Sequence, residues 1–169
     1  MDDVMPDIPR LYSAIAEWMA CMVVILPFPK RFSKVKTGII MAVMLIAQSG
    51  FMVVTENVSL FFWLPCMIGA VFLMLLFIYV SCSIKLTDAV YGVLIAFVAA
   101  EFMASIEWQI ACYFGIVQSG VRWIEWSVLI GGYGLISVIL FKLLHVHLPE
   151  SGQMDIGWKE CVSAFLIAI

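Results

Sequence analysis

The segment AAEFMASIEWQI, Ala99–Ile110, places two carboxylates, Glu101 and Glu107, inside a stretch that is otherwise apolar enough to cross a membrane. An acidic side chain inside a bilayer costs about 3 kcal/mol even on lenient insertion scales, so it usually faces a bundle interior or a water-filled cavity. The segment therefore predicts a transmembrane helix with a polar site on its surface.

The rest of the chain is as apolar as this segment. Of its 169 residues, 64% are hydrophobic and 12% are charged, whereas a soluble domain is about half apolar and about a quarter charged. Apolar runs of about 20 residues recur along the chain and indicate transmembrane helices. We expect an all-α fold, a polytopic transmembrane helix bundle with five full helices plus the start of a sixth, in a single domain over 1–169. The expected helices are about 11–28, 37–54, 60–80, 89–114 and 123–144, with a truncated helix from about 158.

The charges predict how this bundle is oriented. The loop KRFSKVK, residues 30–36, is basic and is therefore expected on the cytoplasmic side. The acidic N-terminus, MDDVMPDIPR, lacks the positive start of a cleaved signal peptide, so the first helix should be retained and the N-terminus should lie outside. The last apolar run, residues 161–169, is too short to span a membrane, and we expect the chain to continue beyond it.

Enzyme chemistry has no support in the sequence. There is no glycine-rich nucleotide loop, catalytic dyad or nucleophile elbow, and we expect no enzyme activity within these residues. The cysteines are scattered without metal-site spacing, and His145 and His147 do not share a helical face, so we expect no metal and no cofactor. Net charge is only −3 and no basic tail is present, which excludes nucleic acid as an expected partner.

Polar side chains within the expected helices are the candidate ligand-binding or signal-coupling residues. They are Glu17, Gln48, Glu101, Ser105, Glu107 and Trp108. By helical rise, Glu17, Gln48 and Glu107 should form an outer polar cluster, with Glu101 deeper in the membrane. Helical spacing places Glu101, Ser105 and Trp108 on one stripe and Glu107 on another, so this helix should present its two acids to two neighbours.

A structural role is the alternative for each acid. Glu17 and Glu107 could sit near a membrane surface and reach water, and Glu101 could be protonated in a hydrogen bond between helices. No lysine or arginine falls in the expected membrane core, so no internal cationic partner is apparent for any of the three.

Two segments, IPRLYSAIAEWMAC (8–21) and AFVAAEFMASIEWQI (96–110), resemble the N-terminal multi-helix membrane sensor region of bacterial GHKL-type sensor histidine kinases, the group that includes peptide quorum-sensing receptors. The resemblance implies a signal-sensing and transducing domain of a two-component system in the bacterial cytoplasmic membrane. It also implies an extracellular or membrane-borne small ligand or peptide, and a homodimer. Kinase activity would belong to sequence beyond residue 169, because the cytoplasmic catalytic region is absent here.

Two other functions stay open. The chain could be the substrate-binding membrane subunit of a vitamin-type importer, in which the same acids would line a substrate pocket open to the outside. It could also be a membrane assembly protein whose acids only fix helix packing. A seventh helix followed by an ATP-binding domain would favour the kinase, whereas a stop after a completed sixth helix beside transporter ATPase genes would favour the importer.

Overall fold

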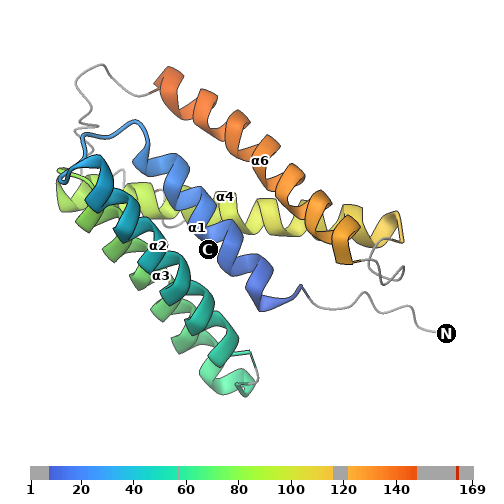
Figure 1. The fold of residues 1–169 in the computed structure, drawn as a ribbon. Helices are drawn as coiled ribbons and strands as arrows, with labels where there is room; N and C mark the ends of the chain where they lie inside the picture. Colours follow the sequence, from blue (N-terminus) through green and yellow to red (C-terminus); the bar gives the residue numbers. More distant parts are fainter. Residues whose placement is uncertain (1–7, 57, 116–121, 148–162, 164–169) are drawn as a thin grey trace.

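The computed structural model describes residues 8–56, 58–115, 122–147 and 163, and five helices make up nearly all of these ranges (Figure 1). The helices are α1 (Arg10–Ile25), α2 (Lys34–Val54), α3 (Leu60–Ser81), α4 (Leu86–Tyr113) and α6 (Arg122–His147). The predicted all-α fold is confirmed for the described chain, with helix ends within a few residues of those expected. The helix expected from about residue 158 lies outside the described residues, apart from Ser163.

Four of the helices, α2, α3, α4 and α6, are long and apolar enough to cross a membrane. The prediction of five full spans is wrong for α1, which has only 16 residues. At 1.5 Å per residue α1 is about 24 Å long, shorter than a hydrocarbon core of about 30 Å. Pro9 precedes its first turn and Pro27 follows its last. Because proline lacks a backbone N–H, Pro27 cannot continue the helical ladder, and α1 ends before the expected residue 28.

The short helix α1 is the centre of the bundle. It contacts α2, α3, α4 and α6, while α2 pairs with α3 and α4 pairs with α6. Figure 1 shows α2 and α3 side by side as a hairpin, α4 crossing α1 obliquely, and α6 on the side away from the hairpin. A helix too short to span on its own is thus surrounded by four that are long enough.

Small residues allow α1 and α4 to approach closely. Ala16 and Ala20 on α1 are fully buried, and α4 buries a small residue at every fourth position: Gly92, Ala96, Ala100 and Ala104. Apolar side chains gain little by leaving lipid, so membrane helices associate through close packing of this kind. A Cβ on Gly92 would lie only 3.1 Å from Cγ1 of Val24.

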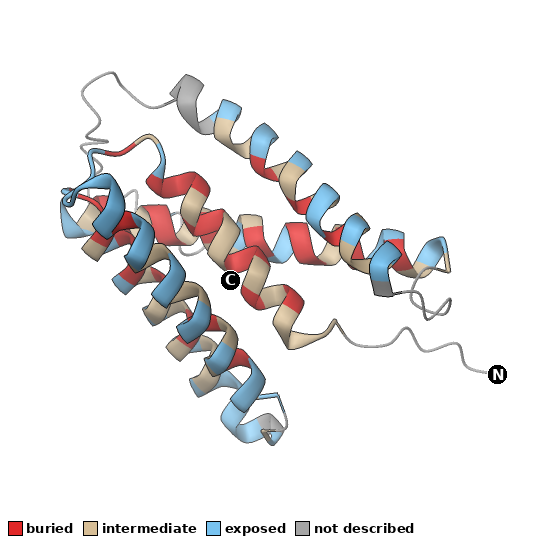
Figure 2. Cartoon of the chain, viewed as in Figure 1, coloured by how far each residue is buried: buried red, intermediate tan, exposed pale blue. Residues whose placement is uncertain are grey.

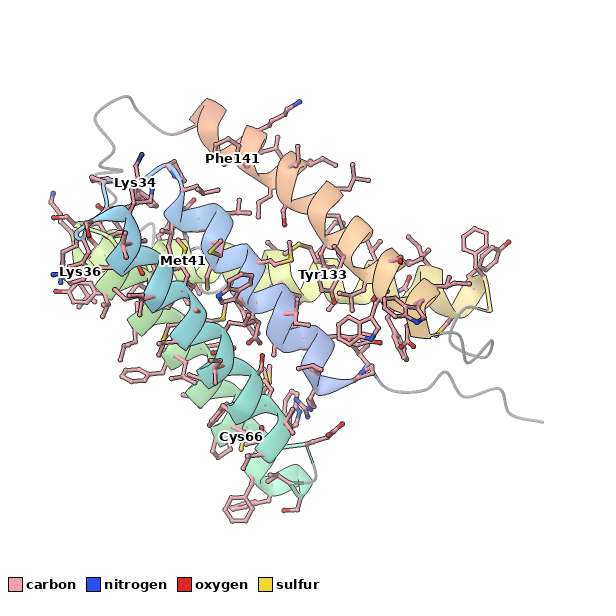
Figure 3. All side chains as sticks on the ribbon, in the orientation of Figure 1. Lys34, Lys36, Met41, Cys66, Tyr133 and Phe141 are labelled. Atoms are coloured by element: carbon pink, nitrogen blue, oxygen red, sulfur yellow. The ribbon has the colours of Figure 1, made fainter. Side chains whose placement is uncertain are left out.

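The polar loops define two ends of the bundle. At the basic end, the backbone N–H of Arg31 donates to the carbonyl of Ser81 (3.0 Å), and that of Ser83 donates to the carbonyl of Pro29 (2.9 Å). The α1–α2 and α3–α4 connections are therefore joined. Figure 3 shows Lys34 and Lys36 at this end and Cys66 toward the other, where α2 turns into α3.

The outer faces of the bundle are apolar. Figure 2 shows buried residues concentrated along α1 and α4 and exposed ones along the outer faces of α2, α3 and α6. The exposed residues include large hydrophobic side chains on each of these three helices, such as Ile46, Phe72 and Ile130. Soluble proteins rarely expose apolar patches larger than a few hundred Å². This surface is suited to lipid.

Candidate functional site

Glu17 and Gln48 meet in the interior between α1 and α2. Both side chains are buried, and Gln48 Nε2 donates a hydrogen bond to Glu17 Oε2. The predicted proximity of these two residues is confirmed. The other oxygen, Oε1, is buried and has no hydrogen-bond partner within the described residues, so the carboxyl group of Glu17 is only half satisfied.

Glu107 is buried at a different place, against α6. A Cβ on Gly132 of α6 would lie 3.6 Å from Cγ of Glu107, and neither carboxylate oxygen has a hydrogen-bond partner in the described part of the chain. Its neighbours on the α4 stripe, such as Met103 and Ala104, are also buried. The expected outer cluster of Glu17, Gln48 and Glu107 therefore divides into a Glu17–Gln48 pair and a separate Glu107.

Glu101 is exposed on the surface of the protein, whereas Glu17 and Glu107 are buried, and its expected depth in the membrane stays a prediction. Rise along a helix fixes depth but not direction: Glu101 and Glu107 are six residues apart and point about 120° from each other. The middle of α4 crosses α1 (Figure 1) and buries Ala96 and Ala100, while Glu101 lies on another side of the helix and lines an open pocket. Glu107 thus faces one neighbouring helix, α6, whereas Glu101 faces a pocket that several elements line and not a single second helix.

Ser105 and Trp108 do not share the environment of Glu101. The Ser105 hydroxyl accepts a hydrogen bond from Gln109 Nε2 on the same helix (3.2 Å). Trp108 is buried and packs edge-on against Tyr12, with ring centroids 5.9 Å apart. Tyr12 also packs against Trp126 of α6. Trp108 therefore belongs to an aromatic cluster that joins α1, α4 and α6.

The pocket beside Glu101 is the strongest candidate site. Its volume is about 610 Å³, within the range of small-molecule sites. Its lining comes from the segment before α1, from α1, from the end of α2, from the start of α3 and from the middle of α4. The lining residues are Ile8, Pro9, Arg10, Ser13, Met52, Glu56, Trp63, Met67 and Glu101.

Charges of both signs line this pocket. Arg10 contributes a guanidinium group, and Glu56 and Glu101 contribute carboxylates. The Arg10 side chain contacts the sulfur of Met67 (N···S 3.9 Å), but it forms no ion pair within 4.0 Å with any carboxylate of the described residues. Among the described residues, the guanidinium and the carboxylates of this pocket are therefore not held in an ion pair with each other.

A second cavity, of about 510 Å³, lies between α4 and α6. Its lining is apolar apart from the Tyr91 hydroxyl, with residues such as Val98, Phe102 and Leu140. None of the described residues that line it is charged, so this lining gives no basis for recognising a polar signal.

Three charged residues of interest were missed by sequence reasoning. Arg10 lies just before the first apolar run and Glu56 just after the second, so neither was considered as a site residue. If the first two helices run in opposite directions, both residues lie at the same end of the bundle. Asp88 precedes the helix expected at about 89–114, but it lies in the first turn of α4 and is fully buried. Neither of its carboxylate oxygens has a hydrogen-bond partner among the described residues. Nothing in the sequence separates a buried first-turn aspartate from an exposed one.

These features define a multi-helix protein suited to a membrane, with a charged pocket at the end away from its basic loop. No protein-family model, curated protein or solved structure matches the chain. Within the described ranges, no group of three or more His, Cys, Asp or Glu side chains is arranged to hold a metal ion.

Proposed function

We propose that this chain is the membrane-embedded signal-sensing domain of a bacterial sensor histidine kinase of the GHKL type. The observation that carries the proposal is the pocket of about 610 Å³, which brings charged side chains from α1, from the residues just after α2 and from α4 together at one end of the bundle. Such a concave site with a few convergent polar groups is the usual form of a small-molecule binding site.

Orientation follows from the basic loop. Lys30, Arg31, Lys34 and Lys36 lie at the end of the bundle where α1 ends and α2 begins, and the pocket lies where α2 ends and α3 begins. By the positive-inside rule the basic end faces the cytoplasm. The pocket then opens to the outside of the cytoplasmic membrane, where an external ligand could reach it.

Signal transmission is supported by the contacts of α1. A ligand that touches α1, α2, α3 and α4 at once favours one arrangement of these helices over another, provided that it binds the two arrangements with different affinity. Helix α6 is bonded to the same end of α1, because the Tyr133 hydroxyl donates to the Tyr12 carbonyl (3.2 Å) and the Tyr12 hydroxyl donates to the Glu125 carboxylate. Displacement of α1 would therefore reach α6.

The test is autophosphorylation of the full-length gene product in native membranes. Glu101→Gln removes a pocket charge at an exposed position, so it should shift the phosphorylation level about fivefold without changing the unfolding temperature. Lys142→Gln, which neutralises an exposed charge on α6 outside the pocket, should leave both quantities unchanged. Wild-type protein that never autophosphorylates, or an unchanged level in a well-expressed Glu101→Gln variant, would contradict the proposal.

The same pocket would also suit the substrate-binding membrane subunit of an importer, since it is proposed to open outward. That function predicts copurification with a transporter ATPase and loss of substrate uptake in Glu101→Gln cells. Observing both of these results, without autophosphorylation, would replace the sensor proposal.

A further inference from the structure

Arg10 is available to bind an anionic group. It lies in the first turn of α1, is half-buried, and lines the pocket. A guanidinium carries five N–H donors arranged to match a carboxylate or phosphate. Among the described residues, its side-chain contact is the weakly accepting sulfur of Met67, which leaves most of its donors without an acceptor in that part of the chain.

Glu101 and Glu56 are available to bind a cationic group. Both are exposed, and they approach the pocket from α4 and from the end of α2. Neither carboxylate lies within 4.0 Å of the Arg10 guanidinium in the part of the chain that the structure describes. Among the described residues, neither acid is therefore held in an ion pair with Arg10.

The remaining walls favour a ligand with an apolar body. Trp63, Met52 and Met67 supply an aromatic ring and two thioether side chains. An indole face attracts cations, and methionine adapts its shape to different apolar groups. A cavity of about 610 Å³ has room for a molecule larger than a single charged group.

From this arrangement we infer that the pocket binds a zwitterion, with the anionic group of the ligand on Arg10 and its cationic group on Glu101 and Glu56. A ligand with one charge would leave side chains of the other sign desolvated without a partner, which is unfavourable. Free amino acids, dipeptides and phosphatidylethanolamine headgroups share this chemistry. The inference rests on the proposed function, whose pocket it uses, and it specifies the class of ligand.

Binding to the purified full-length protein in nanodiscs of phosphatidylglycerol tests the inference, with three matched probes. Alanyl-leucine is a zwitterion, N-acetyl-alanyl-leucine lacks the cation, and alanyl-leucine amide lacks the anion. Alanyl-leucine should bind at least about tenfold more tightly than either derivative, because each derivative loses one charge-assisted contact. Equal binding of all three, or tighter binding of a derivative, would overturn the inference.

Two variants identify which side chain binds which charged group of the ligand. Arg10→Gln should weaken the binding of alanyl-leucine about tenfold. It should leave the affinity for the amide unchanged, since the amide has no anion for Arg10 to bind. Glu101→Gln should weaken the binding of alanyl-leucine and leave the affinity for the N-acetyl derivative unchanged, because that derivative has no cation. Lys142→Gln should alter none of these affinities, because Lys142 lies outside the pocket. Equal losses for all three probes in either pocket variant would contradict the assignment.

Adding phosphatidylethanolamine to the nanodiscs distinguishes the two sources of a zwitterion. Competition with alanyl-leucine would identify a lipid headgroup as a ligand, and absence of competition would indicate a soluble one. If neither alanyl-leucine nor phosphatidylethanolamine binds at millimolar concentration, the zwitterion inference is wrong. Autophosphorylation distinguishes the two proposals. If a zwitterion binds without any change in phosphorylation, only the sensor function is wrong. If pocket variants change phosphorylation but no zwitterion binds, only the ligand class is wrong.

Discussion

Gln48 supplies the hydrogen bond that the described structure gives to the buried carboxyl group of Glu17. A buried polar group that loses its partner costs about 1–3 kcal/mol, although measured hydrogen bonds between membrane helices average nearer ~0.6 kcal/mol. The pair is therefore expected to hold α1 against α2.

Gln48→Leu should lower the free energy of unfolding by about 1–2 kcal/mol, measured by denaturation of the purified protein in mixed detergent micelles. Glu17→Leu combined with Gln48→Leu should cost less than the sum of the two single changes, because the double variant leaves no orphaned group. Gln109→Leu is the control, since Gln109 is exposed and bonds only to Ser105 of its own helix in the described structure. Strict additivity would show that the bond contributes nothing.

Gly92 permits the close contact between α4 and α1. Gly92→Leu would force atoms into the space of Val24, since even a Cβ would lie 3.1 Å from that side chain. Overpacking of this kind costs about 1–3 kcal/mol, and the same denaturation assay should show it. Gly38→Leu on α2 has nothing within 4 Å of its Cβ and should be nearly neutral. Equal effects of the two substitutions would refute the packing argument.

Sequence reasoning at this scale found the acids but not all of their surroundings. Proximity of Glu17 and Gln48 could be predicted because both lie at similar depths on neighbouring helices. The burial of Glu107 and the exposure of Glu101 could not be predicted, because distance along a helix axis does not reveal how the helix crosses its neighbours. Arg10 was missed as a pocket residue, since it immediately precedes the first apolar run.

Tyr133, which is fully buried, is one of the residues that hold helix α6 to α1, beside the contacts of Tyr12 with Glu125 and Trp126. Figure 3 shows Tyr133 on the side of α6 that faces the rest of the bundle. Its hydroxyl donates to the carbonyl of Tyr12, and its neighbours one turn away on the same face, Leu129 and Ser137, are buried as well. In the described structure, this face of α6 contacts α1 and α4.

Tyr133→Phe should remove this hydrogen bond and retain the ring, at a cost of about 0.5–1.5 kcal/mol. Tyr133→Ala should cost about 3–5 kcal/mol, because it also leaves a cavity. Thermal unfolding of the purified protein measures both. An equal loss for the two variants would mean that the hydroxyl, and not ring packing, dominates.

The helices themselves were predictable as elements, since long apolar runs have few alternatives in a membrane. Their pairing was not, because lipid-facing and buried positions are similarly apolar. The four-residue spacing of small residues on α4, from Gly92 to Ala104, was the available signal for its contact with α1. The shortness of α1 could have been read from Pro9 and Pro27, which bracket it.

The whole molecule has a basic end, where the α1–α2 and α3–α4 connections are joined, and a pocket end. The two ends differ because consecutive helices run in opposite directions, so that alternate connections lie at the same end. Which end faces the cytoplasm is proposed from the charge of the loop at residues 30–36.

Cysteine labelling in spheroplasts tests that orientation. Ser59→Cys, at the start of α3, should react with a membrane-impermeant maleimide in intact spheroplasts, and Ser33→Cys, at the start of α2, should react only after permeabilisation. Background labelling of Cys82 should be low. Burial raises the pKa of this thiol to about 11, although the nearby Lys30 and Arg31 lower it. At neutral pH the thiol is therefore protonated and reacts slowly with the maleimide. The reverse labelling pattern would invert the topology.

The most direct test of the sensor proposal places a cysteine inside the pocket and measures autophosphorylation after the cysteine is labelled. Ser13 lines the cavity on α1, and Ser13→Cys in the full-length protein is treated with the impermeant maleimide from outside while autophosphorylation is followed. The sensor account predicts that the thiol is labelled and that labelling changes phosphorylation about fivefold or more, with no change in the parent protein that retains Ser13. A thiol that is labelled without any change in phosphorylation, or that is labelled only after permeabilisation, would contradict it.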